Sequence, residues 1–187
     1  MELKNISKSF NGKTVLHDIS LTVNDGERVM LSGVSGRGKT TLLRIMMGVE
    51  KPDCGEVNGR PEKQSAVFQE DRLPEAFSVY ACVKACAPKS CTKEDIIKHL
   101  SEVGLGGEEG KSANMLSGGM RRRTAIVRAV INDADILYLD EPFTGLDEAT
   151  KKSVVEYINR HTDGKTIVLV SHDAEDAELM GARIIQL

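Results

Sequence analysis

The sequence contains no tryptophan, and aromatic residues make up only 4% of its 187 residues. Its N-terminus, MELKNISKSF, lacks the apolar segment of a signal peptide, and no apolar run approaches the roughly 20 residues that cross a bilayer. These absences predict a cytoplasmic chain that cannot itself form a pathway through a membrane. The net charge of -3, with both signs interspersed, offers no general attraction to nucleic acid, so we expect no nucleic-acid partner.

The four cysteines show no clear metal-binding pattern. Cys82, Cys86 and Cys91 follow the spacing C-x3-C-x4-C, but neither a C-x2-C pair nor a histidine at ligand spacing accompanies them. In a reducing compartment this pattern favours reduced thiols on or beside a helix. We therefore predict no metal-thiolate site.

The length predicts one compact domain over residues 1–187. Alternating apolar and polar residues near the N-terminus, with turn signals at Asn11-Gly12 and Asn24-Asp25-Gly26, predict short antiparallel strands. Later apolar runs are nearly continuous, as in parallel strands that are buried on both faces. These runs are RVMLSG, SAVF, DILYLD, TIVLVS and RIIQL.

Helical patterns alternate with these runs, which predicts an α/β fold with a parallel-sheet core and an N-terminal antiparallel β subdomain. The expected helices span residues 39–47, 93–103, 119–131, 148–160 and 174–180. The segment from about residue 71 to 114 has two helical patterns and no convincing strand. We interpret it as an inserted α-helical subdomain.

A phosphate-binding loop is predicted at GVSGRGKT, residues 33–40, between the strand RVMLS and a helix. This is the P-loop pattern G-x-x-x-x-G-K-[ST], whose glycines let backbone amides approach phosphate oxygens. Lys39 is expected to reach the β- and γ-phosphates, and Thr40 to bind Mg²⁺. The predicted nucleotide-binding residues here are Gly33, Val34, Ser35, Gly36, Arg37, Gly38, Lys39, Thr40 and Thr41.

Two adjacent acids end the apolar strand DILYLD. Asp140 would lie at the carboxyl edge of the sheet, where open α/β folds bind ligands and where a carboxylate can hold Mg²⁺. Glu141 is a candidate to polarise the attacking water. The alternative is that both are solvated loop charges, but the phosphate loop favours a catalytic role.

Taken together, the motifs resemble those of the ATP-binding subunits of ABC transporters, in the same order and over essentially the whole chain. LSGGM, residues 116–120, resembles the signature motif LSGGQ of that family, and TGLD, residues 144–147, stands where its D-loop belongs. The resemblance implies that Phe10 stacks on adenine, that Gln69 touches Mg²⁺ and the attacking water, and that His172 senses the γ-phosphate. A core aromatic and a structural histidine are the alternatives for Phe10 and His172.

The sequence departs from the family pattern at three places. Met120 replaces the signature glutamine, and together with VFQEDRLP this resembles importers of nitrate, sulfonates and taurine. The tryptophan usual in that branch is missing, and EAF stands in its place. Arg37 replaces the common serine of the phosphate loop, where it lies over the phosphates or points to solvent.

The resemblance also implies partners. It predicts an ATPase that powers a separate membrane permease, on the inner face of the cell membrane, with a solute-binding protein in the full complex. Ser117, Gly118 and Gly119 would cap the γ-phosphate held by a second copy, which gives a head-to-tail homodimer. Leu73, Phe77 and Tyr80 are either apolar anchors for the permease or the core of the inserted segment.

Two other functions are alternatives to a transport ATPase. A soluble ABC-type ATPase acting on DNA or ribosomes usually has a long coiled coil or two fused cassettes, and this sequence has neither. A nonhydrolytic nucleotide-binding module is disfavoured by intact Lys39, Asp140, Glu141 and His172. The run Arg121-Arg122-Arg123 points in three directions on a helix, which favours a solvated or phosphate-facing role over nucleic-acid binding.

Overall fold

The computed structural model describes residues 1–34 and 36–187, which form two compact units. The first unit comprises Met1–Gln64, Asp135–Glu141 and Gly164–Leu187, and the second comprises Ser65–Ala134 and Pro142–Asp163. The expected single domain with an insertion at residues 71–114 remains a prediction. In the part of the chain that the structure describes, no helix has the length and apolarity needed to cross a membrane.

The first unit opens with a three-stranded antiparallel sheet in the order β2-β1-β4, as the N-terminal pattern predicts. Its strands are β1 (Glu2–Phe10), β2 (Lys13–Thr22) and β4 (Cys54–Asn58). Asn11 and Gly12 both have positive φ, 50° and 78°, so they form the tight turn that pairs Phe10 with Lys13. Strand β4 was not predicted, because its sequence, CGEVN, has no apolar pattern and only pairing with β1 identifies it.

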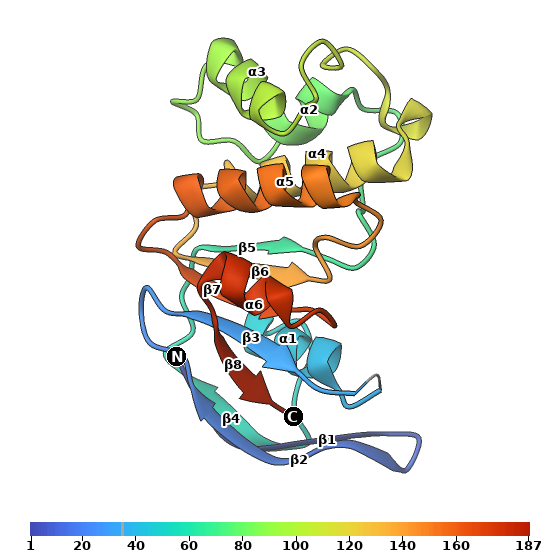
Figure 1. Ribbon diagram of the computed structural model, residues 1–187. Helices are drawn as coiled ribbons and strands as arrows, with labels where there is room; N and C mark the ends of the chain where they lie inside the picture. The colour runs from blue at the N-terminus through green and yellow to red at the C-terminus, as the bar shows by residue number, and fades with distance from the viewer. Residues whose placement is uncertain (35) are drawn as a thin grey trace. The chain divides into compact units, whose positions relative to one another are not determined.

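A five-stranded sheet with the order β5-β6-β7-β3-β8 forms the core that positions the site (Figure 1). Its strands are β3 (Arg28–Ser32), β5 (Gln64–Val67), β6 (Ile136–Asp140), β7 (Thr166–Val170) and β8 (Arg183–Gln186). β6 pairs in parallel with β7, β7 with β3, and β3 with β8. Every residue of β6 and β7 is buried, which explains their continuous apolar sequences and confirms the predicted parallel core.

The described residues of the first unit form two helices. Helix α1 (Lys39–Met47) packs against β6 and β7, and α6 (Glu175–Met180) packs against β3. α1 has the predicted bounds because Gly38 precedes it and Gly48, with a left-handed φ of 78°, ends it. The Arg60 side chain donates hydrogen bonds to the carbonyls of Ile45 and Met46 in the last turn of the helix.

The second unit is mostly helical (Figure 1). It contains α2 (Val79–Lys84), α3 (Lys93–Glu102), the 3-10 turn η1 (Ala113–Met115), α4 (Gly118–Val130) and α5 (Glu148–His161). Side-chain caps begin four of these helices, supplied by Ser78, Thr92, Ser117 and Asp147. α2 and α3 are the two helical patterns expected within residues 71–114, and both pack against α4.

Candidate functional site

The phosphate loop, residues 33–40, joins β3 to α1 as its motif requires. Of this segment, Ser35 lies outside the described residues. Gly38 has φ 87°, and a Cβ on it would lie 2.8 Å from side-chain atoms of Val15 and of Leu16. Only glycine therefore fits at the point where the loop turns into the helix.

The start of α1 is open to an anion. No side chain caps this helix, so the amides of its first turn lack the partner that a capping residue would supply. Lys39 is buried, and its Nζ donates to the carbonyl oxygen of Gly33 at 2.7 Å and contacts that of Val34 at 3.4 Å. The ammonium group is thus folded back onto the loop that a phosphate would enter.

The remaining predicted residues of the loop differ in exposure. Val34, Gly36 and Arg37 are exposed, whereas Thr41 is half-buried in the first turn of α1. A Cβ at Gly36 would meet open space, so its glycine is required by its φ of 82° and not by crowding.

A hydroxyl and a carboxylate meet at the carboxyl edge of the sheet. Thr40 lies in the first turn of α1, and its Oγ1 donates a hydrogen bond of 3.1 Å to Oδ1 of Asp140. Asp140 is the last residue of β6 and is 2% exposed, so its carboxylate is held in place and shielded from water. Mg²⁺ prefers oxygen ligands such as these two, so the pair fits the metal that the sequence predicts.

Glu141 follows directly and is held in an unusual backbone conformation. Its φ is 50°, which is rare for a residue other than glycine, and its amide donates to the carbonyl of Val170 on β7. Its Oε1 lies 3.1 Å from Nε2 of His172, without the geometry of a hydrogen bond, and is buried with no donor among the described residues. Burial raises the pKa of this carboxyl, as does the neighbouring Asp140, while His172 opposes the shift.

Phe10 ends β1 and is 43% exposed, which rules out the alternative of a core aromatic. The Nζ of Lys8 lies 5.2 Å from the centre of its ring, and the same ammonium pairs with Glu50 at 2.7 Å and with Asp53 at 3.2 Å. Lys8 is a contact that the sequence analysis missed. Its position two residues before Phe10 on the same strand face was the available signal.

The signature segment, residues 116–120, lies in the second unit and opens α4. The Oγ of Ser117 accepts a hydrogen bond of 3.3 Å from the amide of Met120, so the serine is the cap of the helix. A Cβ at Gly118 would meet nothing within 4 Å, whereas one at Gly119 would contact Leu146 at 3.6 Å. Gly118 thus presents an unobstructed backbone at a helix N-terminus, as a phosphate cap requires.

Comparison with known proteins agrees with this arrangement of motifs. The model of the family described as ABC transporter matches residues 16–144. The chain belongs to the ABC transporter family. A solved structure, the dimeric bacterial ABC transporter cassette MJ0796, superposes with a TM-score of 0.87 at 28% identity, over 100% of this chain and 93% of that one.

Curated relatives of this chain include proteins with two kinds of name. The spermidine/putrescine import ATP-binding protein of Spiroplasma citri is 39% identical over 99% of this chain and 58% of its own length. An aliphatic sulfonates import ATP-binding protein of Rhodococcus jostii is 38% identical over 100% of this chain and 78% of its own length. The chain therefore spans little more than half the length of the spermidine/putrescine relatives that it matches.

Within the ABC fold, the predicted site residues divide between the two units. The first unit brings Lys39, Thr40, Asp140, Glu141 and His172 to one edge of its sheet. The second unit contains Gln69, the signature segment and the D-loop residues 144–147. In the D-loop, Asp147 caps α5 by accepting from the Thr150 amide at 2.9 Å, which gives this acid a structural role.

The arginine run of α4 was predicted wrongly. The three side chains do point in three directions, but each of them binds backbone carbonyls inside the second unit. Arg121 donates to Ala113, Arg122 donates to Phe68 and Gln69, and Arg123 donates to Gly119, Val103 and Gly104. The missed signal was periodicity, because Arg122 is in phase with the buried residues Ala125, Ile126 and Ala129.

The expected permease anchors also differ from one another. Leu73 is buried and belongs to the core of the second unit, as the alternative reading held. Phe77 is 46% exposed and lies in the loop that precedes α2, and Tyr80 is half-buried. Of the three, Phe77 is therefore the side chain available to an apolar partner.

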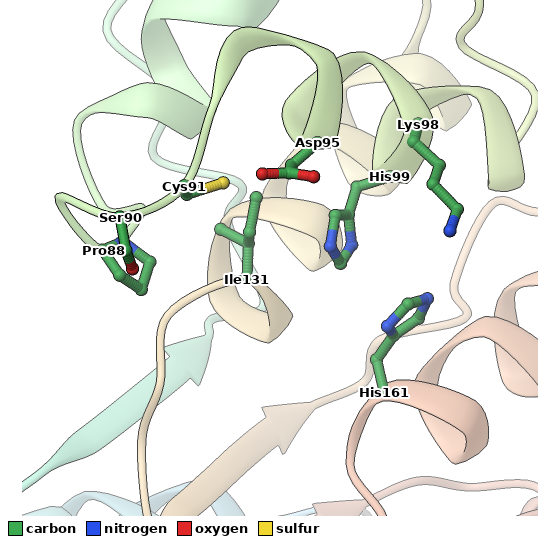
Figure 2. A pocket seen from close by; sticks show the side chains of 8 residues that line it. All are labelled: Pro88, Ser90, Cys91, Asp95, Lys98, His99, Ile131 and His161. Atoms are coloured by element: carbon green, nitrogen blue, oxygen red, sulfur yellow. The ribbon is translucent and has the colours of Figure 1, made fainter.

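A pocket of about 300 Å³ lies in the second unit (Figure 2). Two of its lining residues, His99 and His161, are in contact, with ring centroids 4.5 Å apart. Nδ1 of His99 is 2.8 Å from the hydroxyl of Tyr157, and Nε2 of His161 is 2.8 Å from Oε2 of Glu102. The pocket is lined by Pro88, Ser90, Cys91, Asp95, Lys98, His99, Ile131 and His161.

We expect the folded state of the second unit to lose stability at acidic pH, because of His99 in this pocket. Burial lowers the pKa of His99, and the neighbouring His161 lowers it further. A histidine with a lowered pKa binds fewer protons in the folded state than in the unfolded state. The free energy of unfolding is therefore higher above about pH 6.5, and it falls as the pH drops below that value. Urea unfolding followed by circular dichroism at pH 7.5 and pH 5.5 should show this loss. His99→Gln should reduce it, and an equal loss in both proteins would contradict the assignment.

Proposed function

We propose that this chain binds ATP with Mg²⁺ and hydrolyses it, as the ATP-binding subunit of an ABC importer. The observation that carries the proposal is the hydrogen bond between Thr40 and Asp140 at the start of α1. Next to this pair, Glu141 has a buried carboxylate oxygen without a hydrogen-bond donor. A hydroxyl, two carboxylates and an open helix start at one sheet edge are the groups that phosphoryl transfer to water needs.

Each residue would have a distinct role. Lys39 would exchange the carbonyls of Gly33 and Val34 for the β- and γ-phosphate oxygens of the nucleotide. Thr40, Asp140 and Gln69 would hold Mg²⁺, which neutralises charge that develops on the phosphates. Glu141, with a pKa raised by burial, would orient the attacking water and accept its proton.

His172 would then keep Glu141 in register with the γ-phosphate. Its Nε2 lies 3.1 Å from the Glu141 carboxylate, and its own side chain is 57% exposed. The ring can therefore reach both the carboxylate and a ligand that enters from solvent. Phe10 would stack on adenine with one face, because Lys8 lies against its ring and is fixed by Glu50 and Asp53.

We infer that two copies work head to tail, with each ATP between the phosphate loop of one and the signature segment of the other. The open backbone at Gly118 supports this, because the Ser117 side chain accepts only from the Met120 amide and leaves those of Gly118 and Gly119 for an anion. The relative MJ0796 was solved as a dimer, and also in a post-hydrolysis state with ADP and Pi. Docking to a permease would place the pair on the inner face of the membrane.

The names of the relatives cover two opposite classes of solute. Relatives named for aliphatic sulfonates, which are anions, and for spermidine and putrescine, which are cations, are equally similar to this chain. Both names describe import, which supports that direction. A permease and a solute-binding protein would select the solute.

The proposal is tested by measuring ATP hydrolysis with the purified chain and by capturing its partners from detergent-treated native membranes. We expect Mg²⁺-dependent release of phosphate and co-purification with a membrane-spanning protein. Nucleotide binding without hydrolysis would favour a nonhydrolytic module. Stable association with ribosomes or DNA, and with no membrane protein, would favour the soluble ATPase and overturn the transport proposal.

A further inference from the structure

Arg122 is a buried charge that no role in phosphate binding explains. It lies in α4, five residues after Ser117, and is 6% exposed. Its Nη1 donates to the carbonyl of Phe68 at 2.7 Å, and its Nη2 donates to that of Gln69 at 2.5 Å. The guanidinium therefore holds the backbone of the glutamine that we propose to contact Mg²⁺.

An acid completes the surroundings of Arg122. Oδ1 of Asp71 lies 3.2 Å from Nη1, and burial raises the pKa of this carboxyl while Arg122 opposes the shift. A buried ion pair is costly to break, since removal of one partner leaves the other charge unpaired in a desolvated place. The two carbonyls and Asp71 thus fix the guanidinium, and the guanidinium fixes them.

A second arginine of the same helix binds the next residues of the segment. Nη2 of Arg128 donates to the carbonyl of Asp71 at 3.1 Å, and its Nη1 donates to that of Arg72 at 3.0 Å. Together, Arg122 and Arg128 bind four carbonyls in the stretch Phe68–Arg72. Arg72 has φ 47°, so the chain turns where these contacts end.

We propose that Arg122 is a positioning residue that acts through Gln69. It binds the backbone of Gln69 to the helix that begins at the signature segment. The position of the glutamine side chain relative to the phosphate cap is thereby fixed. A phosphate bound at Ser117 would then set the position of Gln69 without direct contact between the two residues. This inference rests on the proposed function, because it assigns Arg122 a part in the same ATP site.

A double-mutant cycle tests the inference by measuring kcat, the KM for ATP and the Mg²⁺ requirement. This requirement is the Mg²⁺ concentration that half-saturates the binding of a fluorescent ATP analogue, so it is measured without turnover. Arg122→Gln is expected to lower kcat by about 10- to 100-fold, the usual cost of losing a residue that orients a metal contact. It should also raise the Mg²⁺ requirement. In a Gln69→Ala background the same substitution should have little further effect, because the residue through which Arg122 acts is gone.

Arg123→Gln is the matched control. Arg123 lies on the same helix and donates to three carbonyls, but all of them belong to Val103, Gly104 and Gly119. Its substitution should leave the Mg²⁺ requirement unchanged, whatever it does to stability. If Arg122→Gln does not fold, Arg122→Lys keeps the charge beside Asp71, loses the fork that binds two carbonyls and is expected to raise the Mg²⁺ requirement.

The outcomes separate this inference from the proposed function. An unmodified chain that hydrolyses no ATP would overturn both. Hydrolysis by the unmodified chain, with an Arg122 effect that is equally large with Gln or Ala at position 69, would overturn the positioning role alone. An unchanged Mg²⁺ requirement in both Arg122 variants would also overturn it.

Discussion

Replacement of Glu141 by Gln is expected to leave ATP binding intact and to reduce turnover by about 100- to 10,000-fold, the usual contribution of a positioned general base. Glutamine keeps the shape of the side chain but cannot accept a proton from water. Lys39, Thr40 and Asp140, which we propose to hold the nucleotide and Mg²⁺, are unchanged in this variant. Phosphate release and binding of a fluorescent ATP analogue measure the two quantities separately.

We expect the Glu141→Gln variant to be at least as stable as the unmodified chain. Burial raises the pKa of Glu141, so its ionised form destabilises the folded state at neutral pH. A neutral glutamine removes that cost, and the melting temperature should therefore not fall at pH 7.5. This outcome would separate lost chemistry from lost structure.

Glu148→Gln provides the control for a general effect of charge. Glu148 is exposed in the first turn of α5 and has no part in the proposed site. This variant should hydrolyse ATP at the normal rate. Normal hydrolysis by Glu141→Gln would remove Glu141 from the central role and leave His172 without a catalytic partner.

The core of the fold could be predicted because its signals are local and physical. Every residue of strands β6 and β7 is buried, and strands that are buried on both faces have continuous apolar sequences. Helix α1 was predicted to the residue, since a glycine in the left-handed conformation stands at each end. The phosphate-loop motif and the acid at the end of an apolar strand predicted Thr40 and Asp140 at one edge of the sheet, although they are 100 residues apart in the chain.

The contacts that were missed depend on distant partners. Strand β4 contains exposed polar residues, and its existence follows from backbone pairing with β1. Arg122 could be placed on a buried face by periodicity, but the carbonyls of Phe68 and Gln69 lie more than fifty residues away. No local pattern in the sequence reveals which segment packs there.

A substitution in the signature segment is expected to have the second large effect on turnover. Ser117→Arg is expected to leave ATP binding by the monomer nearly intact and to reduce both ATP-driven dimerisation and turnover by about 100-fold or more, since an unpaired charge buried in an interface costs about 3 to 5 kcal/mol. Ser117 lies in the second unit, whereas Lys39 and Thr40 lie in the first. Size-exclusion chromatography with light scattering, with a slowly hydrolysed ATP analogue, would measure the dimer.

Thr92→Arg separates this effect from simple damage to a helix start. Both residues cap a helix, because Ser117 accepts from the Met120 amide and Thr92 accepts from the Asp95 amide. Each substitution should therefore cost a similar 0.5 to 2 kcal/mol in local stability, roughly the value of a cap. Only Ser117 lies where a phosphate held by a second copy would be capped. Equal loss of dimer in the two variants, or loss of ATP binding in the Ser117→Arg monomer, would refute the shared site.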